Sequence, residues 1–283
     1  MAKLFRLAVT SIDRPEVEDR SGVIDTCVAA IVEAGERGAD LVLLPEEPDI
    51  IAGATYGVHT LEEHPALLRF REQAAASGVG VISTLSVKVG DRHANTAFLL
   101  DRKGEILGLY RKKHPAPSEE AILTEPVVAG DPFPVFDFEG MKMGIGICMD
   151  IHFPEMFRIY GLKGADLVCV PTMYLDYTGD MLESIEKARA IDSQMYFALS
   201  RYITRPFLAG KNMGYAKVIA PDGRVICSTA HRPGVAIAEF DPKWRMEFWG
   251  DGYAGNMRYM FDIIRRPDLY GELVRPKEKD KEG

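Results

Sequence analysis

Short apolar runs alternate with amphipathic stretches along the chain, starting close to the N-terminus. Residues 4–9 and 41–45 are apolar runs of the length typical of buried strands. Between them, apolar residues recur every three to four positions, which predicts a helix that Ser21 caps and Gly38 closes. A strand–helix–strand unit of this kind predicts parallel strands joined by a right-handed crossover, and therefore an α/β fold.

The alternation continues to about residue 240. Further strands are predicted at 79–85, 95–100, 105–110, 143–148, 164–171, 195–200, 214–220, 224–228 and 235–240, and further helices over about 62–77, from about 154, and around 181–193. The turn-forming residues 101–104 (DRKG) predict a hairpin. Because no Pro/Ser/Gly-rich linker interrupts the chain, we expect one domain over 1–274 and a charged tail at 275–283.

One eight-residue segment occurs twice. GADLVLLP at 38–45 and GADLVCVP at 164–171 are identical at six of eight positions, and each follows a predicted strand and helix. This repeat indicates two halves related by approximate twofold symmetry. The alternative is that buried strands that follow helices commonly have this composition.

Composition excludes several classes of function. The chain has 34 Lys and Arg against 42 Asp and Glu, a net charge of −8, which argues against an extended nucleic-acid surface. The apolar runs are too short to cross a membrane, and the first residues do not fit a secretory signal. The four cysteines lack metal-binding spacing, so we expect reduced thiols in a cytoplasmic protein without a metal.

Reactive side chains follow three of the predicted strands. They are Glu46, Lys112 and Cys148, and the carboxyl ends of strands are where α/β proteins gather ligands and catalytic groups. A lone cysteine at a strand end is more often a small buried apolar residue. Here Asp150, a turn and a helix start follow Cys148, and a nearby helix N-terminus favours the thiolate. We expect the other cysteines, Cys27, Cys169 and Cys227, to be unreactive.

Three segments around these residues resemble a known family. PEE at 45–47, YRKKH at 110–114 and GIGICMDIHFPE at 144–155 are similar, in order and spacing, to the signature segments of the nitrilase (carbon–nitrogen hydrolase) superfamily. The resemblance implies a four-layer α–β–β–α sandwich of two β-sheets with internal pseudo-twofold symmetry. It also implies no metal or organic cofactor, and a homodimer or larger homo-oligomer.

The resemblance assigns a role to each reactive side chain. Glu46 is expected to act as general base, Lys112 as cationic stabiliser of the oxyanion, and Cys148 as nucleophile, with the N–H of Met149 as a second oxyanion donor. The adjacent Glu47 and Lys113 are expected to point away from the site, as neighbouring residues on extended backbone do. Many relatives carry a second active-site glutamate, here Glu119, Glu120 or Glu125, with Glu120 preferred.

Residues near Cys148 limit the classes of substrate that the resemblance implies. Nitrilases tend to have tryptophan and glutamate after the cysteine, whereas this chain has Met149 and Asp150, as amidases and carbamoylases do. His152 stands where carbamoylases tend to have an arginine that binds a carboxylate, which argues against an amino-acid carboxylate. His114 is expected to make a structural hydrogen bond. Wall residues are expected among Tyr174, Tyr177 and Arg201, which otherwise are ordinary loop positions.

The predicted reaction is hydrolysis of a small linear amide or N-carbamoyl compound through a cysteine thioester, with release of ammonia. Three alternatives stay open. They are acyl transfer from the same thioester, hydrolysis of nitriles, and a non-catalytic scaffold that keeps the fold. The retained Glu, Lys and Cys argue against the scaffold.

Overall fold

The computed structural model describes residues 4–14, 22–116, 132–173, 180–204, 215–250 and 253–275. The chain divides into two units, Met1–Trp244 and Arg245–Gly283. One domain over 1–274 with a tail at 275–283 stays a prediction, because residues after Arg275 lie outside the described ranges. Within those ranges, none of the helices combines the length and apolar character that crossing a membrane requires.

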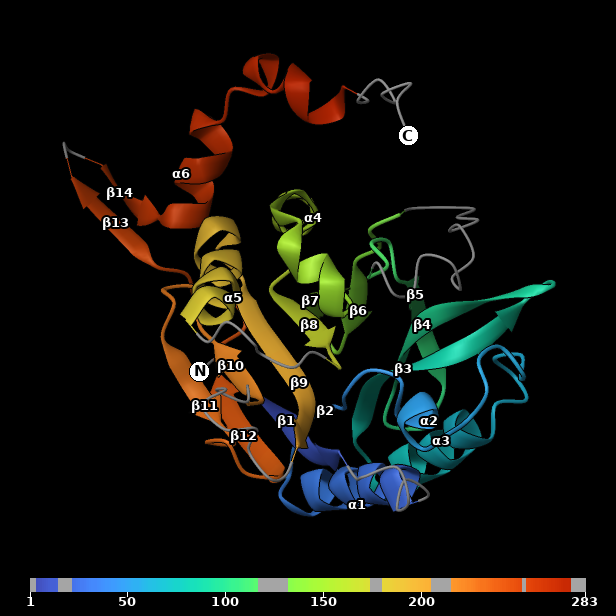
Figure 1. The fold of residues 1–283 in the computed structure, drawn as a ribbon. Helices are drawn as coiled ribbons and strands as arrows, with labels where there is room; N and C mark the ends of the chain where they lie inside the picture. The colour runs from blue at the N-terminus through green and yellow to red at the C-terminus, as the bar shows by residue number, and fades with distance from the viewer. Residues whose placement is uncertain are drawn as a thin grey trace. The chain divides into compact units, whose positions relative to one another are not determined.

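The first unit alternates strands and helices in the predicted order (Figure 1). Its first half contains β1 (Phe5–Arg14), α1 (Val23–Glu36), β2 (Leu41–Leu43), α2 (Pro48–Ile51), α3 (Pro65–Ser77), β3 (Gly80–Val89), β4 (Arg92–Leu100) and β5 (Ile106–Arg111). Its second half contains β6 (Phe136–Phe138), β7 (Met141–Ile145), a 3-10 turn (Cys148–His152), α4 (Pro154–Leu162), β8 (Leu167–Pro171), α5 (Asp180–Ser193), β9 (Tyr196–Thr204), β10 (Lys217–Ile219), β11 (Val225–Ser228) and β12 (Gly234–Phe240). The predicted hairpin is confirmed, since β4 and β5 pair antiparallel. Ser21 lies outside the described residues.

The strands follow the hydrogen-bonded order β5-β4-β3-β2-β1-β9-β8-β7-β6. Parallel pairs β1–β2–β3 form the centre of the first half, and parallel pairs β7–β8–β9 form the centre of the second. The long strand β9 joins them: residues 196–200 pair with β8 and residues 201–204 pair with β1. The strand ends of the two halves therefore meet where β9 passes from one to the other.

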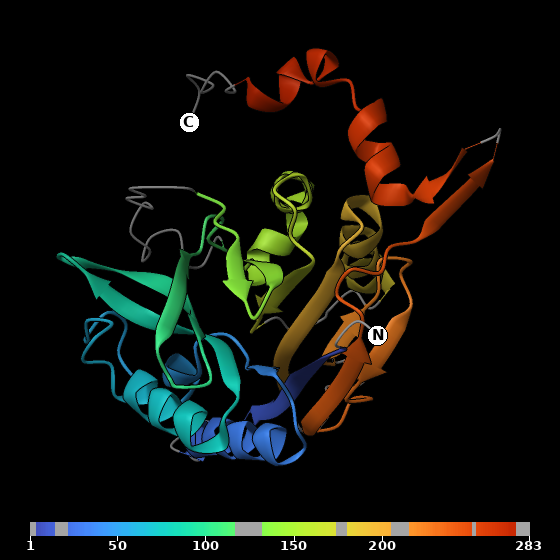
Figure 2. The same ribbon diagram turned by 180° about the vertical axis from the view of Figure 1, so that it is seen from behind.

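Alternate residues of the first-half strands face different cores. Leu7 and Leu41 belong to a core that also contains Met143 of β7, whereas Ala8 and Val42 pack in a second core with α1 and α3. Figures 1 and 2 show α1 and α3 along the first-half strands, with α4 and α5 beside the second-half strands. The α/β fold is confirmed, and the order of layers is consistent with the predicted α–β–β–α sandwich.

The repeated segment is a structural repeat down to its hydrogen bonds. In the first half, the Asp40 N–H donates to the Arg6 carbonyl at 2.7 Å, and the Arg6 N–H donates to the Asp40 carboxylate at 2.8 Å. In the second half, Asp166 and Lys142 make the same two bonds, at 2.6 and 3.1 Å. Each aspartate thus joins the start of the strand that follows a helix, β2 or β8, to the parallel strand before that helix, β1 or β7.

The helices repeat their packing as well. A Cβ on Gly35 of α1 would lie 2.7 Å from the Cβ of Ser77 in α3, and a Cβ on Gly161 of α4 would lie 3.3 Å from the Cβ of Ser193 in α5. In both halves, a glycine near the end of the first helix lets the last residue of the second helix approach closely. The prediction of two related halves is therefore confirmed.

The second unit was not predicted as regular structure. It contains β13 (Glu247–Gly250), β14 (Tyr253–Asn256), α6 (Met257–Ile264) and two 3-10 turns, Pro267–Leu269 and Gly271–Val274. The Asn256 side chain caps α6 by accepting a hydrogen bond from the Tyr259 N–H. The Tyr259 side chain is exposed. The homodimer or larger homo-oligomer stays a prediction.

Candidate active site

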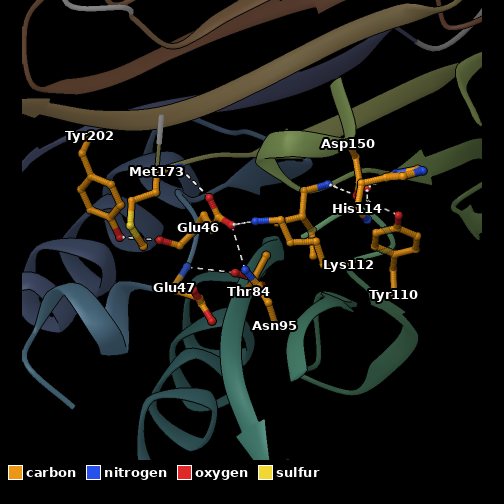
Figure 3. Close-up of polar contacts among 11 residues, drawn as sticks. Glu46, Glu47, Thr84, Asn95, Tyr110, Lys112, His114, Asp150, Met173 and Tyr202 are labelled. Carbon is orange, nitrogen blue, oxygen red and sulfur yellow. Dashed lines mark hydrogen bonds and ion pairs between the residues drawn. The ribbon is translucent and has the colours of Figure 1, made fainter. Parts of the chain in front are cut away.

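The Glu46 carboxylate accepts three hydrogen bonds at the strand ends (Figure 3). Glu46 follows β2 and is buried. Its Oε1 accepts from Asn95 Nδ2 and from Lys112 Nζ, both at 2.8 Å, and its Oε2 accepts from the Met173 N–H at 2.7 Å. A carboxylate offers about four lone-pair sites. Three donors therefore fix its orientation and leave one site for another proton.

The β4–β5 hairpin brings two of these donors together. Asn95 lies on β4, Lys112 follows β5, and the Lys112 N–H donates to the Asn95 carbonyl at 3.0 Å. The Lys112 ammonium is buried against Glu46, so the two charges compensate each other inside the protein. The predicted Glu46 and Lys112 are thus brought into direct contact.

Cys148 begins a tight turn directly after the second-half strand β7. Its backbone has a positive φ of 44°, a conformation that is uncommon for residues other than glycine. The buried Asp150 carboxylate holds the turn: it accepts from the Ile147 N–H and the Tyr110 hydroxyl, both at 2.8 Å, and contacts His114 Nδ1 at 2.7 Å. The predicted structural hydrogen bond of His114 is confirmed.

The groups around the Cys148 thiol shift its pKa in opposite directions. Burial raises its pKa most, and the Glu46 carboxylate raises the pKa further, while the Lys112 ammonium and a hydrogen bond with Thr172 lower it. The net pKa lies well above the ordinary thiol value. The expectation that the turn favours a thiolate is therefore wrong for this structure, because desolvation by burial is the largest effect on the pKa of the thiol. The thiol needs a base, and Glu46 lies next to it.

A pocket opens at Cys148, and its walls come from the second half. It is lined by Cys148, Ile151, Thr172, Leu182, Glu186, Leu199 and Arg201. The positions of these residues along their elements explain why they face the same pocket. Leu199 and Arg201 share one face of β9, and Leu182 and Glu186 lie one turn apart on α5. Arg201 was predicted as a wall residue, and the structure places it there.

The structure does not place the other predicted site residues in the pocket. Glu119, Glu120 and Glu125, and also Tyr174 and Tyr177, fall outside the described residues. Met149 lies in the turn after Cys148, and its role as oxyanion donor stays a prediction. His152 ends that turn and is not among the described residues that line the pocket. Burial and the nearby Arg189 lower the pKa of His152.

The residues next to the predicted pair differ in their surroundings. Glu47 is buried on backbone with a φ of 42°, and its N–H donates to Thr84 Oγ1 at 2.9 Å. Lys113 is half-buried with its ammonium 5.1 Å from the centre of the Tyr110 ring, and burial lowers its pKa. Neither residue lines the pocket in the part of the chain that the structure describes.

The contributors that sequence reasoning missed include Asn95, Thr172, Glu186 and Arg189. Thr172 was detectable, because it follows the second copy of the repeat as Glu46 follows the first. Arg189 Nε donates to the Ile151 carbonyl at 2.8 Å and so supports the turn that carries Cys148. Glu186 lies on α5, ten residues before the start of β9, and nothing in the sequence around it indicated a place in the pocket. Across the described residues, no three His, Cys, Asp or Glu side chains are placed to hold a metal ion.

Known proteins are similar to this chain in sequence and in fold. The chain matches the carbon–nitrogen hydrolase family over residues 6–246. It is 30% identical over 254 residues to a chloroplastic omega-amidase of Arabidopsis thaliana, over 84% of this chain and 66% of that protein. It is 29% identical over 275 residues to the deaminated glutathione amidase of Rattus norvegicus, over 88% of this chain and 79% of that protein. The matched region thus spans just under two thirds of the plant relative.

Solved structures agree with this. An amidase from Nesterenkonia sp. superposes with a TM-score of 0.72 at 25% identity, over 86% of this chain and 92% of that one. Another structure of that amidase, with a TM-score of 0.70, 25% identity and coverage of 84% and 93%, shows acrylamide added at its active-site cysteine. With the family match across most of its length, the chain belongs to the carbon–nitrogen hydrolase family of enzymes, which act on carbon–nitrogen bonds other than peptide bonds.

Proposed function

We propose that this enzyme hydrolyses a small linear amide or N-carbamoyl compound through a thioester on Cys148 and releases ammonia. The observation that carries the proposal is the position of Glu46, whose carboxylate contacts Lys112 Nζ at 2.8 Å and lies beside the Cys148 thiol. A proton acceptor, a cation and a nucleophile therefore meet at one buried point. These are the groups that acyl transfer to a thiol requires.

Acylation begins with the proton of the thiol. Because the raised pKa keeps Cys148 protonated, Glu46 takes this proton while the sulfur attacks the carbonyl carbon. The carbonyl oxygen becomes an oxyanion, which the Lys112 ammonium and the Met149 N–H stabilise. Glu46 then gives the proton to the leaving nitrogen, the C–N bond breaks, ammonia leaves, and the acyl group stays on sulfur as a thioester.

Deacylation uses the same carboxylate. Glu46 takes a proton from a water molecule, the resulting hydroxide attacks the thioester carbon, and the C–S bond breaks. The sulfur recovers its proton from Glu46, and the carboxylic acid leaves. For an N-carbamoyl substrate, the leaving group of the acylation step is the amine instead of ammonia, and the acid formed on deacylation is carbamic acid, which decomposes to carbon dioxide and ammonia. One glutamate serves both half-reactions, which fits the three donors that hold it in place.

The names of the relatives support amides as the substrates. Both curated relatives and the solved structure described above are amidases by name. The same thioester also serves acyl transfer when an amine replaces water, and the experiment below separates the two outcomes. The partner is proposed to be a small molecule rather than a nucleic acid or a membrane, and the cytoplasmic location stays a prediction.

The test is ammonia release from a panel of aliphatic amides, ω-amides, N-carbamoyl amines and N-carbamoyl amino acids. The expected result is release by the wild type and by Cys169→Ala, and none by Cys148→Ala. Cys169 is the matched control, because it is a buried cysteine on β8 that does not line the pocket. Release of ammonia by Cys148→Ala at the wild-type rate, or no release by the wild type from any compound, contradicts the proposal.

A further inference from the structure

Two residues that line the pocket, Glu186 and Arg201, belong to a buried cluster of three charges that also contains Lys217. Arg201 on β9 is 2% exposed, Glu186 on α5 is 1% exposed, and Lys217 on β10 is 3% exposed. Arg201 Nη2 contacts Glu186 Oε1 at 2.5 Å, and Lys217 Nζ contacts Glu186 Oε2 at 2.6 Å. One carboxylate is thus shared between two cations, and both its oxygens are engaged.

Among the described residues, the cluster carries more positive than negative charge. The other acidic group described near Lys217 is Glu183, but Glu183 is 36% exposed and pairs with Lys187 at 2.7 Å. Within the part of the chain that the structure describes, the buried cluster therefore holds two positive charges against one negative charge. Glu46 and Lys112 compensate each other and do not change this balance. A buried charge without a counterion is costly, so a site of this kind favours an anion.

Arg201 also has a hydrogen-bond donor, its Nε–H, that no described residue accepts. Its Nε is buried and, among the described residues, has no hydrogen-bond acceptor, although Arg201 lines the pocket together with Cys148. A guanidinium presents its N–H groups in a planar fork that matches the two oxygens of a carboxylate. Glu186 uses only Nη2 of that fork. The unused donor and the excess charge belong to the same residue, on the wall of the same pocket.

We propose that Arg201 binds a carboxylate of the substrate, so that the enzyme prefers linear amides or carbamoyl compounds that carry an acidic group a few bonds from the scissile carbon. This inference rests on the proposed function and specifies its substrate class. It also revises the expectation that His152 argues against a carboxylate, because the cation that faces the pocket comes from β9 rather than from the turn after Cys148. Glu186 and Lys217 act as positioning residues that hold the guanidinium against the pocket.

The first experiment compares matched substrates that differ in the group far from the amide. The acid amides malonamate, succinamate and glutaramate are each paired with the diamide of the same length, and 4-aminobutyramide supplies a positive charge. We expect kcat/KM to be highest for an acid amide, about 10- to 100-fold above its diamide, and lowest for the cationic amide. Equal values for an acid amide and its diamide at all three lengths overturn the proposal.

The second experiment identifies the residue. In Arg201→Gln, we expect the preference for the acid amide over the diamide to disappear, mainly through a raised KM for the acid amide. The ratio of the two kcat/KM values does not depend on how much of the variant is folded. Arg189→Gln is the matched control, because Arg189 is a buried arginine that donates to the Ile151 carbonyl but is not among the described residues that line the pocket. It should slow both substrates alike and keep the ratio. An unchanged ratio in Arg201→Gln overturns the proposal.

A third experiment separates this inference from the proposed reaction. Binding of the acid amides and diamides to Cys148→Ala is measured by calorimetry, which needs no turnover. We expect at least one acid amide to bind about 10-fold or more tightly than its diamide, and the difference to vanish when Arg201→Gln is added. Binding without the difference refutes the carboxylate site alone, and so does the absence of binding by all three acid amides. Loss of ammonia release with the binding difference intact refutes only the reaction.

Discussion

The two halves of the first unit share a scaffold but end their equivalent strands in different chemistry. GADLVLLP is followed by Glu46, and its repeat GADLVCVP is followed by Thr172. The bonds of Asp40 and of Asp166 are the same, and so is the close approach of the paired helices. The residue directly after the repeat is therefore free to differ without disturbing the strands behind it.

The different residues after the two repeats show that each half contributes different groups to the site. The first half contributes the base and the cation, because its β4–β5 hairpin brings Asn95 and Lys112 to Glu46. The second half contributes the thiol on a turn after β7 and the pocket walls on α5 and β9. The Met173 N–H, one residue past Thr172, donates to Glu46 across the boundary. Neither half alone holds the proposed reaction.

The largest expected effect separates the two buried cysteines of the second half. Cys148→Ala should lower kcat by at least about 10⁴-fold with the fold intact, since it removes the nucleophile. Cys169→Ala should leave kcat within about twofold and cost about 1 kcal/mol of unfolding free energy, since Cys169 packs inside β8. Steady-state kinetics and chemical denaturation measure these effects. Comparable activity losses in the two variants would assign no special role to the turn.

The next largest effect is the difference in kcat between variants of the two residues that follow the repeated segment, Glu46 and Thr172. Glu46→Gln should lower kcat by about 10²- to 10⁴-fold, because the amide keeps the shape but accepts no proton. Thr172→Val should lower it only about 2- to 10-fold, the loss of one neutral hydrogen bond to the thiol. Both variants are assayed on one amide substrate. A larger loss in Thr172→Val than in Glu46→Gln would reverse the roles assigned to the halves.

Lys112→Ala is expected to cost about 3 kcal/mol of transition-state stabilisation, or roughly 10²-fold in kcat, as lost oxyanion donors do. Lys113→Ala is the neighbour control and should change kcat less than about threefold, because Lys113 lies against the Tyr110 ring and outside the pocket lining. Rates and circular dichroism are recorded for both variants. A loss under tenfold in Lys112→Ala would refute its role.

The smallest effect concerns alkaline stability. Burial raises the pKa of Cys169 above its ordinary value of 9.0, so the folded chain holds this proton while the unfolded chain releases it. The stabilisation is complete below about pH 9 and is lost as the pH rises towards the folded pKa. Cys169→Ala should therefore lose about 1 kcal/mol less unfolding free energy per pH unit above pH 9 than the wild type. Identical slopes in denaturant titrations at pH 8 to 11 would contradict this.

Much of the first unit was predictable because its elements are encoded locally. Alternating apolar runs located the strands, and the repeat revealed the two halves. The C-terminal end of β1 was not predictable. The strand continues to Arg14 because residues 11–14 pair with β9, some 190 positions further along the chain. The second unit was also missed, since its short strands and α6 lack a long apolar period.

The site residues that directly follow a strand within a recognisable motif were predictable. The properties that depend on burial in the folded protein were not. Glu46, Lys112 and Cys148 follow recognisable segments, and the structure brings them together. The state of the Cys148 thiol was not predictable, because its pKa depends on burial that only the packed halves create. Glu186 and Lys217 were missed for the same reason: three charged residues, from α5, β9 and β10, form one cluster only after folding.

The most direct test of the account is the partition of the acyl group between water and hydroxylamine. Substrates that share one acyl group but differ in leaving group, such as succinamate and its N-methyl amide, are hydrolysed in the presence of hydroxylamine. We expect the same ratio of hydroxamate to acid from each substrate, because all pass through one thioester on Cys148, and no product from Cys148→Ala. A ratio that changes with the leaving group would mean that the nucleophile attacks the amide itself, without an acyl-enzyme, and would contradict the account.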